Sequence, residues 1–275
     1  MEYYKYIVVI LVYRNTSDLV ECIDSIRDKV PSYKIIVVNA YYDDATRNEV
    51  ERITNQYDCE FINIDNKGYS YGNNRGIELA IKKYNYDYII ISNPDIVIER
   101  FDDTLLNEEF GYDIIAPKIT ASLGRAQNPM AICENRLIAK IVYLGFKRRA
   151  IALVYLGIAI TKIIRFCQLL IYKILKCRIY RIHQAHGSFV LISKKAIEAL
   201  NPVYDEKMFL FAEETVLAAK AKRNNVKICY YEPIAIRHKE DGSMKLSNMM
   251  LNEVLRDSNL YCYEHYIKEN NNCCE

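Results

Sequence analysis

Short apolar runs alternate with amphipathic segments over the first third of the chain. Each apolar run is bounded by polar or turn-forming residues, as in a buried strand, and each intervening segment carries apolar residues at helical spacing. The predicted strands cover residues 6–12, 34–38, 60–64 and 86–92, and the predicted helices cover residues 17–30, 44–57 and 71–84. Strands and helices in this alternation predict a parallel, doubly wound α/β sheet with right-handed crossovers.

The fourth predicted strand runs into the triplet Asn93-Pro94-Asp95. Proline cannot extend the hydrogen-bond ladder of a strand, so the chain turns there and Asp95 lies at the carboxyl end of the sheet. Open α/β sheets bind their ligands at this edge. A carboxylate in that position is suited to hold a divalent cation against a diphosphate. On the triplet alone, a turn with a capping aspartate is the simpler interpretation.

A glycine- and asparagine-rich segment, residues 66–76, joins the third strand to the helix that follows it. Gly68, Gly72 and Gly76 are spaced by four residues. They can allow a ligand to approach the start of the helix, or they can permit a turn and a close contact between helix and sheet. The pattern G-x-G-x-x-G after the first strand is absent, which disfavours a dinucleotide-binding site.

The last third of the chain returns to a globular pattern and carries two further polar motifs. Glu213 and Glu214 follow an apolar run and open a helix, where the helix dipole favours acidic residues. The apolar surroundings can also raise the pKa of one carboxylate enough for it to act as a base. His238 ends an extended segment and is followed by a loop, Lys239 to Ser243, that is suited to face a ligand. The predicted strands are residues 189–192, 226–231 and the extended segment 233–238, and the predicted helices are residues 194–200, 215–223 and 248–267.

Between these two regions lies an apolar segment that is rich in basic residues. Eleven Lys and Arg residues and no acidic residue lie between positions 136 and 183, although the whole chain has a net charge of only +2. On a helix, seven of the basic residues fall within an arc of about 100°, which is typical of a segment that lies in a membrane interface. Gly145 and Gly157 are expected to break the segment into two or three helices. The alternative is a helical hairpin that packs on the domain or across a dimer. The seven residues are Lys140, Lys147, Arg148, Lys162, Arg165, Lys173 and Lys176.

Cysteine usage and the N-terminus point to the cytoplasm. The nine cysteines, which include the adjacent pair Cys273-Cys274, lack metal-ligand spacing and fit free thiols in a reducing compartment. The first apolar run is short and has no small-residue cleavage site, so it is predicted to be a strand and not a signal peptide. No apolar run reaches the roughly 18 residues that a membrane-spanning helix needs.

In this order, the motifs resemble those of inverting glycosyltransferases of the GT-A fold, family 2, and most of all the rhamnosyltransferase-like enzymes of bacterial surface polysaccharide synthesis. The likeness extends over most of the chain and is interrupted by the basic segment. Three features depart from the family pattern: Asn39 stands where the family usually has an aspartate, the first strand ends in Tyr13-Arg14-Asn15 where Tyr-Asn is common, and the metal motif has one acid. The matching segments are Asn66 to Gly76, Asn93-Pro94-Asp95, Ile114-Ile-Ala-Pro117, Gly187-Ser188-Phe189, Glu213-Glu214, and His238 with Gly242-Ser243 after it.

The resemblance implies a Rossmann-like, mostly parallel sheet and the transfer of a sugar, rhamnose or a similar hexose, from a nucleotide diphosphate donor with inversion. Glu214, with Glu213 beside it, would deprotonate the acceptor hydroxyl. Asp95 and His238 would hold Mg²⁺ or Mn²⁺. The implied donor-binding residues are Asn39, Asp44, Gly68, Asn73, Arg75 and Asn93.

The expected organisation follows from the same resemblance and from the basic segment. Residues 1–130 would form the nucleotide-sugar-binding half, 131–182 a basic helical insertion, 183–248 the acceptor-side half, and 249–275 a C-terminal helix and tail. The insertion suggests a glycan acceptor on a polyprenyl diphosphate at the inner face of the plasma membrane. A homodimer is possible, and no nucleic-acid partner is expected. The alternatives are a non-catalytic, membrane-associated binding protein of the same fold and, less favoured, an NAD-dependent dehydrogenase.

Overall fold

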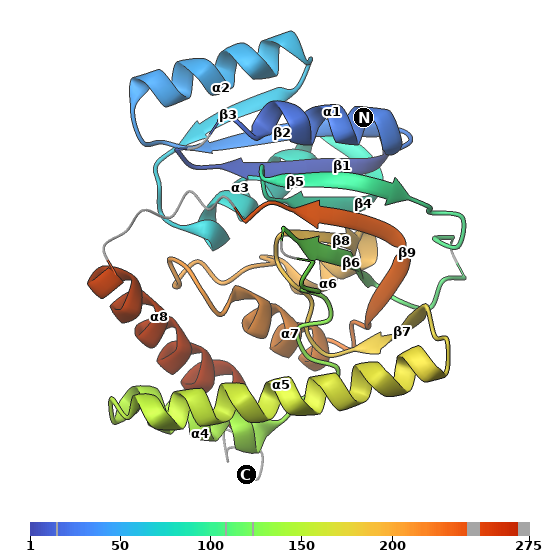
Figure 1. Ribbon diagram of the computed structural model, residues 1–275. Helices are drawn as coiled ribbons and strands as arrows, with labels where there is room; N and C mark the ends of the chain where they lie inside the picture. The colour runs from blue at the N-terminus through green and yellow to red at the C-terminus, as the bar shows by residue number, and fades with distance from the viewer. Residues whose placement is uncertain (15, 108, 123, 241–247, 269–275) are drawn as a thin grey trace, which may run out of the picture.

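A mixed sheet of nine strands organises the described part of the chain (Figure 1). The computed structural model describes residues 1–14, 16–107, 109–122, 124–240 and 248–268. The strands are β1 (Glu2–Val12), β2 (Tyr33–Ala40), β3 (Glu60–Ile64), β4 (Tyr84–Ser92), β5 (Ile96–Phe101), β6 (Ile114–Ala121), β7 (Ile179–Ile182), β8 (Phe189–Ser193) and β9 (Ile228–His238). The helices are α1 (Leu19–Lys29), α2 (Asp44–Gln56), α3 (Tyr69–Lys83), α4 (Arg136–Lys147), α5 (Ile151–Ile174), α6 (Lys194–Leu200), α7 (Glu213–Arg223) and α8 (Asn248–Cys262), which continues into a π-helical turn at Tyr263–Ile267.

The sheet brings the carboxyl ends of its parallel strands to one edge. The strand order is β3-β2-β1-β4-β8-β6-β9-β5, with β7 paired to β9. The first four strands are parallel, as predicted, whereas β8 and β5 run against their neighbours. Because β8 is antiparallel to β4, its first residue Phe189 lies opposite Ser92 at the end of β4. In the same way, Ile96 at the start of β5 and Ala121 at the end of β6 both pair with His238.

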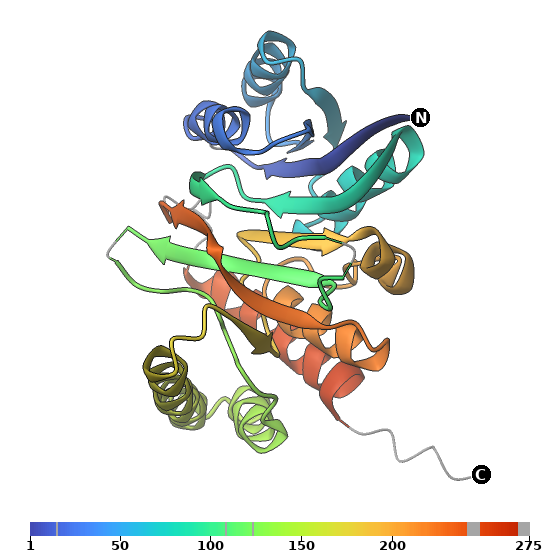
Figure 2. The same cartoon turned by 90° about the vertical axis from the view of Figure 1, so that its right-hand side faces the viewer.

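Both faces of the sheet are covered by helices, so the central strands are buried on both sides (Figures 1 and 2). Along β1, Ile7 and Val9 pack in one core with α3, α6 and α7, while Val8 and Ile10 pack in a second core with α1 and α2. A strand that is covered on both faces reads as a continuous apolar run. This arrangement is the reason why the hydrophobic pattern identified β1, β2 and β4.

The glycines of the 66–76 segment lie at close contacts. A Cβ atom at Gly72 would lie 2.4 Å from Leu11, and one at Gly76 would lie 2.3 Å from Val9. Helix α3 therefore packs so closely against β1 that only glycine fits at these two positions without a shift. Gly68 precedes α3 with φ of 102°, and a Cβ there would lie 2.1 Å from the carbonyl oxygen of Phe209. The packing alternative for this segment is therefore confirmed, and a donor contact at Gly68 stays a prediction.

The basic segment forms two antiparallel helices, and its break is not at the glycines. The prediction that Gly145 and Gly157 interrupt the helix is wrong, because both lie inside helices and the chain turns around Arg149, which has φ of 53°. A Cβ at Gly145 would lie 2.7 Å from Val154, and one at Gly157 would lie 2.4 Å from Val142. A glycine inside a helix costs only about 1 kcal/mol. Here the close packing of α4 on α5 offsets that cost (Figure 2).

Helix α5 is also longer than expected. It runs without interruption through residues 151–174, and its length and mean hydropathy of 1.7 are sufficient to cross a membrane. It is the one such helix among the described residues. The expectation that no segment reaches this length is wrong, because it treated isolated lysines and glycines as interruptions. Only 11% of its most apolar window is buried, so α5 is not a core helix.

Three smaller differences concern strands formed by distant pairing. β5 follows directly after Asp95 and, within the described residues, pairs with β9 alone, and the short strand β7 also pairs with β9. Residues 228–238 form one strand where two segments were predicted, because a register shift accommodates Pro233 inside it. The loop residues Gly242 and Ser243 and the terminal cysteines lie outside the described residues.

Candidate active site

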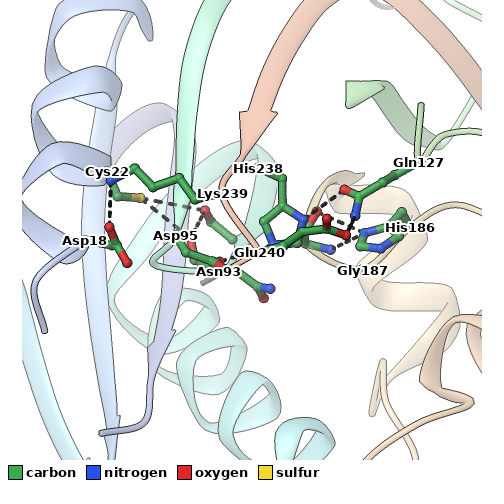
Figure 3. A network of polar contacts seen from close by, with 12 residues as sticks. Asp18, Cys22, Asn93, Asp95, Gln127, His186, Gly187, His238, Lys239 and Glu240 are labelled. Atoms are coloured by element: carbon green, nitrogen blue, oxygen red, sulfur yellow. Dashed lines mark hydrogen bonds and ion pairs between the residues drawn. The ribbon is translucent and has the colours of Figure 1, made fainter. Parts of the chain in front are cut away.

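Asp95 and His238 face each other at the carboxyl edge of the sheet (Figure 3). Asp95 lies between β4 and β5, and His238 is the last residue of β9, so the pairing of β5 with β9 brings the two side chains together. His238 Nε2 lies 3.2 Å from Asp95 Oδ1. Both residues are buried. The backbone N–H of Lys239 donates to the carbonyl of Asp95 at 2.9 Å and holds this contact in place.

Gln127 determines which nitrogen of His238 carries a proton. Its amide nitrogen donates to Glu240 Oε1 at 2.8 Å, so its amide oxygen faces His238 Nδ1, also at 2.8 Å. That oxygen can only accept, so Nδ1 must donate. The lone pair of a neutral His238 then points from Nε2 at the Asp95 carboxylate. Two acceptors at this distance repel, so the pair requires a proton or a cation between them.

A divalent cation fits this pair. One carboxylate oxygen and one imidazole nitrogen are an acceptable donor set for Mn²⁺, whereas Mg²⁺ prefers oxygen alone. No cluster of three or more His, Cys, Asp or Glu side chains occurs within the ranges that the structure describes. A cation at Asp95 and His238 would therefore take its remaining ligands from a bound diphosphate and water.

The two glutamates at the start of α7 have different surroundings. Glu214 reaches the edge of the sheet, where its Oε1 accepts a hydrogen bond from the N–H of Gly187 at 3.3 Å. Glu213 is 5% exposed, and its Oε1 has no hydrogen-bond partner among the described residues. Burial, together with the neighbouring charge of Glu214, raises the pKa of Glu213 to about 8. The carboxylate with the raised pKa is thus the buried Glu213, and the one that reaches the edge of the sheet is Glu214.

The two glutamates are held by an irregular stretch of backbone. Phe211 and Ala212, the residues just before α7, have φ of 72° and 64°. Left-handed conformations are costly for residues other than glycine and cluster at functional sites. Phe211 and Ala212 turn the chain so that α7 begins beside the loop that precedes β8.

His186 and Gln127 also lie at this site, although no role was predicted for either of them from the sequence. The ring of His186 lies 5.7 Å from that of His238, and its Nδ1 contacts the hydroxyl of Ser188 at 2.9 Å. Burial lowers the pKa of His186, which favours the neutral ring. A histidine directly before Gly187-Ser188 was a usable signal. Gln127 lies in an irregular loop and had none.

The two residues predicted to bind the nucleoside lie near the end of β2: Asn39 is in the strand, and Asp44 is the first residue of α2. Asn39 is fully buried, and its Nδ2 donates to Asn63 Oδ1 at 2.6 Å. Its Oδ1 is buried and lacks a hydrogen-bond partner among the described residues. Asp44 is exposed and accepts from the hydroxyl of Tyr41 at 3.1 Å. Arg14 lies over the ring of Tyr42, with 4.2 Å between the guanidinium carbon and the ring centre.

The other predicted donor-binding residues are engaged within the protein. Asn73 is buried and donates to the carbonyl of Tyr69 at 3.1 Å, which leaves its Oδ1 without a partner among the described residues. Arg75 pairs with the carboxylates of Glu78 and Glu206 at 2.7 and 2.6 Å, so its charge is already neutralised. The N–H of Asn93 donates to Ser188 at 2.8 Å and joins β4 to the loop before β8. Donor binding by these residues stays a prediction.

Comparison with known proteins places this geometry in a familiar fold. Residues 7–110 match the Glycosyl transferase family 2 model. Over 190 residues the chain is 24% identical to the low-salt glycan biosynthesis hexosyltransferase Agl10 of Haloferax volcanii. The match covers 68% of this chain and 53% of that protein, so the chain spans about half the length of its relative.

Solved structures of three glycosyltransferases resemble most of the chain. GalNAc-T7 with UDP, GalNAc and Mn²⁺ has a TM-score of 0.64 at 12% identity, covering 95% of this chain and 48% of that one. TarS of S. aureus with UDP-GlcNAc has 0.53 at 16%, covering 91% and 64%. The mannosyltransferase PcManGT of Pyrobaculum calidifontis, with GDP-Man and Mn²⁺, has 0.52 at 10%, covering 91% and 61%. At these identities the likeness shows the fold, which is the GT-A fold, as predicted.

Proposed function

We propose that the protein is a metal-dependent glycosyltransferase that moves a hexose from a nucleotide diphosphate sugar to an acceptor hydroxyl with inversion. The observation that carries this proposal is the pair of acceptors, Asp95 and His238, at the carboxyl edge of the sheet, with Glu214 directed to the same edge from α7. The match to the family 2 model and the nucleotide sugars named with the solved neighbours support it.

Inverting sugar transfer requires one group of residues that holds the leaving diphosphate, and a base on the opposite side of the anomeric carbon that accepts the proton of the acceptor hydroxyl. Asp95 and His238 would hold a cation, and Mn²⁺ suits the imidazole ligand better than Mg²⁺. The bound cation supplies positive charge that neutralises the departing diphosphate. Glu214 would take the proton of the acceptor hydroxyl as the new bond to the anomeric carbon forms and the bond to the diphosphate oxygen breaks. A single displacement of this kind inverts the anomeric centre.

The nucleoside would bind at the ends of β1 and β2. The free acceptor of Asn39 is buried, and a buried polar atom without a partner costs about 1–3 kcal/mol. An N–H group on the edge of a nucleobase would satisfy it. Asn39 is neutral where the family usually has an aspartate, so this contact would be weaker than a charged one.

We further propose a glycan acceptor that is attached to a polyprenyl diphosphate, with the protein at the inner face of the plasma membrane in polysaccharide synthesis. A cavity of about 210 Å³ between α4, α7 and the turn after α8 supports an acceptor with an apolar part. It is lined by Val142, Tyr143 and Tyr263, and at its polar side by Gln184 and Thr215, the residue next to Glu214. Rhamnose or a similar hexose is the sugar that the motif pattern favours.

The deciding experiment is thermal unfolding with UDP-, dTDP- and GDP-sugars and with NADH, each with and without Mn²⁺, followed by assays of sugar transfer. One nucleotide sugar should stabilise the protein only when the metal is present, and Asp95→Ala should abolish that shift. Glu214→Gln should keep the shift and lose transfer. Donor binding without hydrolysis or transfer in the wild type would favour the non-catalytic binding protein. A shift with NADH alone would favour a dehydrogenase.

A further inference from the structure

We propose that α4 and α5 together form a docking surface for an anionic lipid bilayer, and that α5 lies parallel to the membrane plane instead of crossing it. This inference deepens the proposed membrane partner and does not depend on catalysis. Binding to vesicles can be measured without donor, metal or acceptor. A failure here would therefore leave the transferase proposal intact, and the reverse is also true.

Helix α5 exposes large apolar side chains along its whole length. Ile163, Phe166 and Ile174 are 64%, 67% and 70% exposed, and Tyr155 near the start of the helix is 66% exposed. Contiguous apolar surface of this kind is uncommon on soluble monomers and marks an interaction site. In Figures 1 and 2 the helix runs along the lower part of the molecule beside α4, away from the first strands of the sheet.

The charge around this apolar surface identifies its partner. Residues 136–183 carry eleven basic and no acidic side chains. Arg136 and Arg178 pair with glutamates outside this stretch. Lys140, Lys162 and Lys173 are exposed and have no ion-pair partner in the part of the chain that the structure describes. A surface that is both apolar and cationic complements the acyl chains and phosphates of an anionic bilayer.

The basic and the apolar side chains of α5 lie on different sides of the helix, as in a helix that lies in a membrane interface. At 100° per residue, Lys162 and Lys173 lie about 20° apart, so they form one line along α5. The exposed residues Ile163, Leu170 and Ile174 lie about 80–120° farther round the helix. When these three face the acyl chains, the two lysines lie at the border with the headgroups, where their ammonium groups meet lipid phosphates.

The inner side of α5 contacts the rest of the protein along the full length of the helix. These contacts favour an orientation of α5 in the membrane plane over one that crosses the bilayer. Its first half packs on α4 at Gly157, Arg165 in the middle donates to the carbonyl of Ala126 at 2.8 Å, and Tyr172 near the end stacks on Tyr180 at 3.9 Å. A crossing helix would have to release these contacts. It would also place Lys162, the midpoint of the helix, at the centre of the bilayer, where charged side chains are avoided.

Sedimentation with vesicles tests the partner. We expect the protein to bind vesicles of phosphatidylcholine mixed with phosphatidylglycerol, and to bind pure phosphatidylcholine much more weakly. Lys162→Gln/Lys173→Gln should weaken binding to the mixed vesicles about 30-fold, because each lysine near an anionic surface contributes about 1 kcal/mol. Ile163→Ser/Leu170→Ser/Ile174→Ser should weaken it about 100-fold or more. The matched control, Ile81→Ser/Lys82→Gln on the exposed side of α3, should bind like the wild type.

Several outcomes would overturn the proposal. The first is a wild-type protein that ignores both kinds of vesicle, and the second is a control variant that loses as much binding as the α5 variants. The third is a wild-type dimer that the triple serine variant converts to a monomer, which would assign the face to a second copy of the chain. Circular dichroism verifies that each variant is folded. If the triple serine variant unfolds, vesicle binding by Lys162→Gln/Lys173→Gln alone tests the proposal, because both substituted positions are exposed.

Tryptophan fluorescence tests the orientation, since the chain contains no Trp. Single Trp residues at Leu156, Ile163 and Ile174 lie on one side of α5, near its start, middle and end. A helix in the membrane plane places all three at the same shallow depth, so quenchers attached high on the lipid chain should act on them equally. Deep quenching at the middle position together with weak quenching at both ends would show a crossing helix and refute the parallel orientation.

Discussion

Replacing Glu213 by Gln should stabilise the protein at alkaline pH and remove much of the dependence of its stability on pH. Glu213 is buried at the start of α7, Oε1 has no hydrogen-bond partner among the described residues, and its pKa is raised to about 8, chiefly by burial. No positive side chain is among the causes that act on its pKa. Glutamine has the same shape and cannot ionise, so the substitution removes the charge and leaves the packing.

The direction in which stability changes with pH follows from the number of protons bound in the folded and unfolded states. In the unfolded chain this carboxyl releases its proton near its ordinary pKa of 4.5, whereas in the folded protein it keeps the proton up to about pH 8. Between these values the folded state binds more protons, so the free energy of unfolding falls as the pH rises. The slope is at most about 1.4 kcal/mol per pH unit, and the full loss above pH 8 is about 5 kcal/mol for a shift of this size. Coupling to Glu214 shares part of this loss, so about 2–4 kcal/mol is expected.

The assay is urea unfolding of wild type and Glu213→Gln at about pH 5, 7 and 9, read by circular dichroism. The two proteins should be nearly equal at the acidic end, and the variant should gain about 2–4 kcal/mol at the alkaline end. Glu253→Gln on the exposed side of α8 is the control and should follow the wild type. If Glu213→Gln keeps the wild-type slope, the side chain is ionised in the folded protein and the reasoning from burial is wrong.

Other substitutions test the packing and the two ends of the candidate site. Gly72→Ala should lower the free energy of unfolding by about 1–3 kcal/mol, because its Cβ would lie 2.4 Å from Leu11, while Gly111→Ala, with open space around it, should change it by less than about 0.5 kcal/mol. Gln127→Ala should weaken Mn²⁺ binding about 10–100-fold in calorimetric titration, because His238 loses the acceptor that orients its ring. Asn39→Ala should weaken nucleotide binding about 10–100-fold, and unchanged affinity would exclude it from the nucleoside site.

The parts of the fold that could be predicted depend on local or contiguous sequence. β1, β2 and β4 were found because their residues are buried on both faces and read as apolar runs. β5 and β7 are short and exist through pairing with β9, a partner far along the chain, so no local pattern distinguishes them from loops. The glycines of α4 and α5 were read as helix breakers because their effect depends on Val154 and Val142 of the other helix.

The candidate site shows the same division. Asp95, Glu214 and His238 stand in short motifs whose order along the chain is informative, and the structure brings them to one edge of the sheet. The sequence could not decide which of Glu213 and Glu214 reaches the edge of the sheet and which is buried. Neighbouring residues point about 100° apart on a helix, and the direction of α7 is set by the turn before it. Gln127 acts through its contact with His238, which only the folded chain reveals.

The order of strands across the sheet has a consequence for how the protein can be divided. β4, β8, β6, β9 and β5 are neighbours in space, yet they come alternately from before and after the two-helix insertion. Neither piece of a chain cut between α4 and α5 could complete the sheet alone, and each would expose unpaired strand edges to other molecules. The Asp95–His238 pair joins one residue from each piece. Metal binding would thus report that two such fragments had reassembled, which makes the loop between α4 and α5 a natural position for a split-protein sensor.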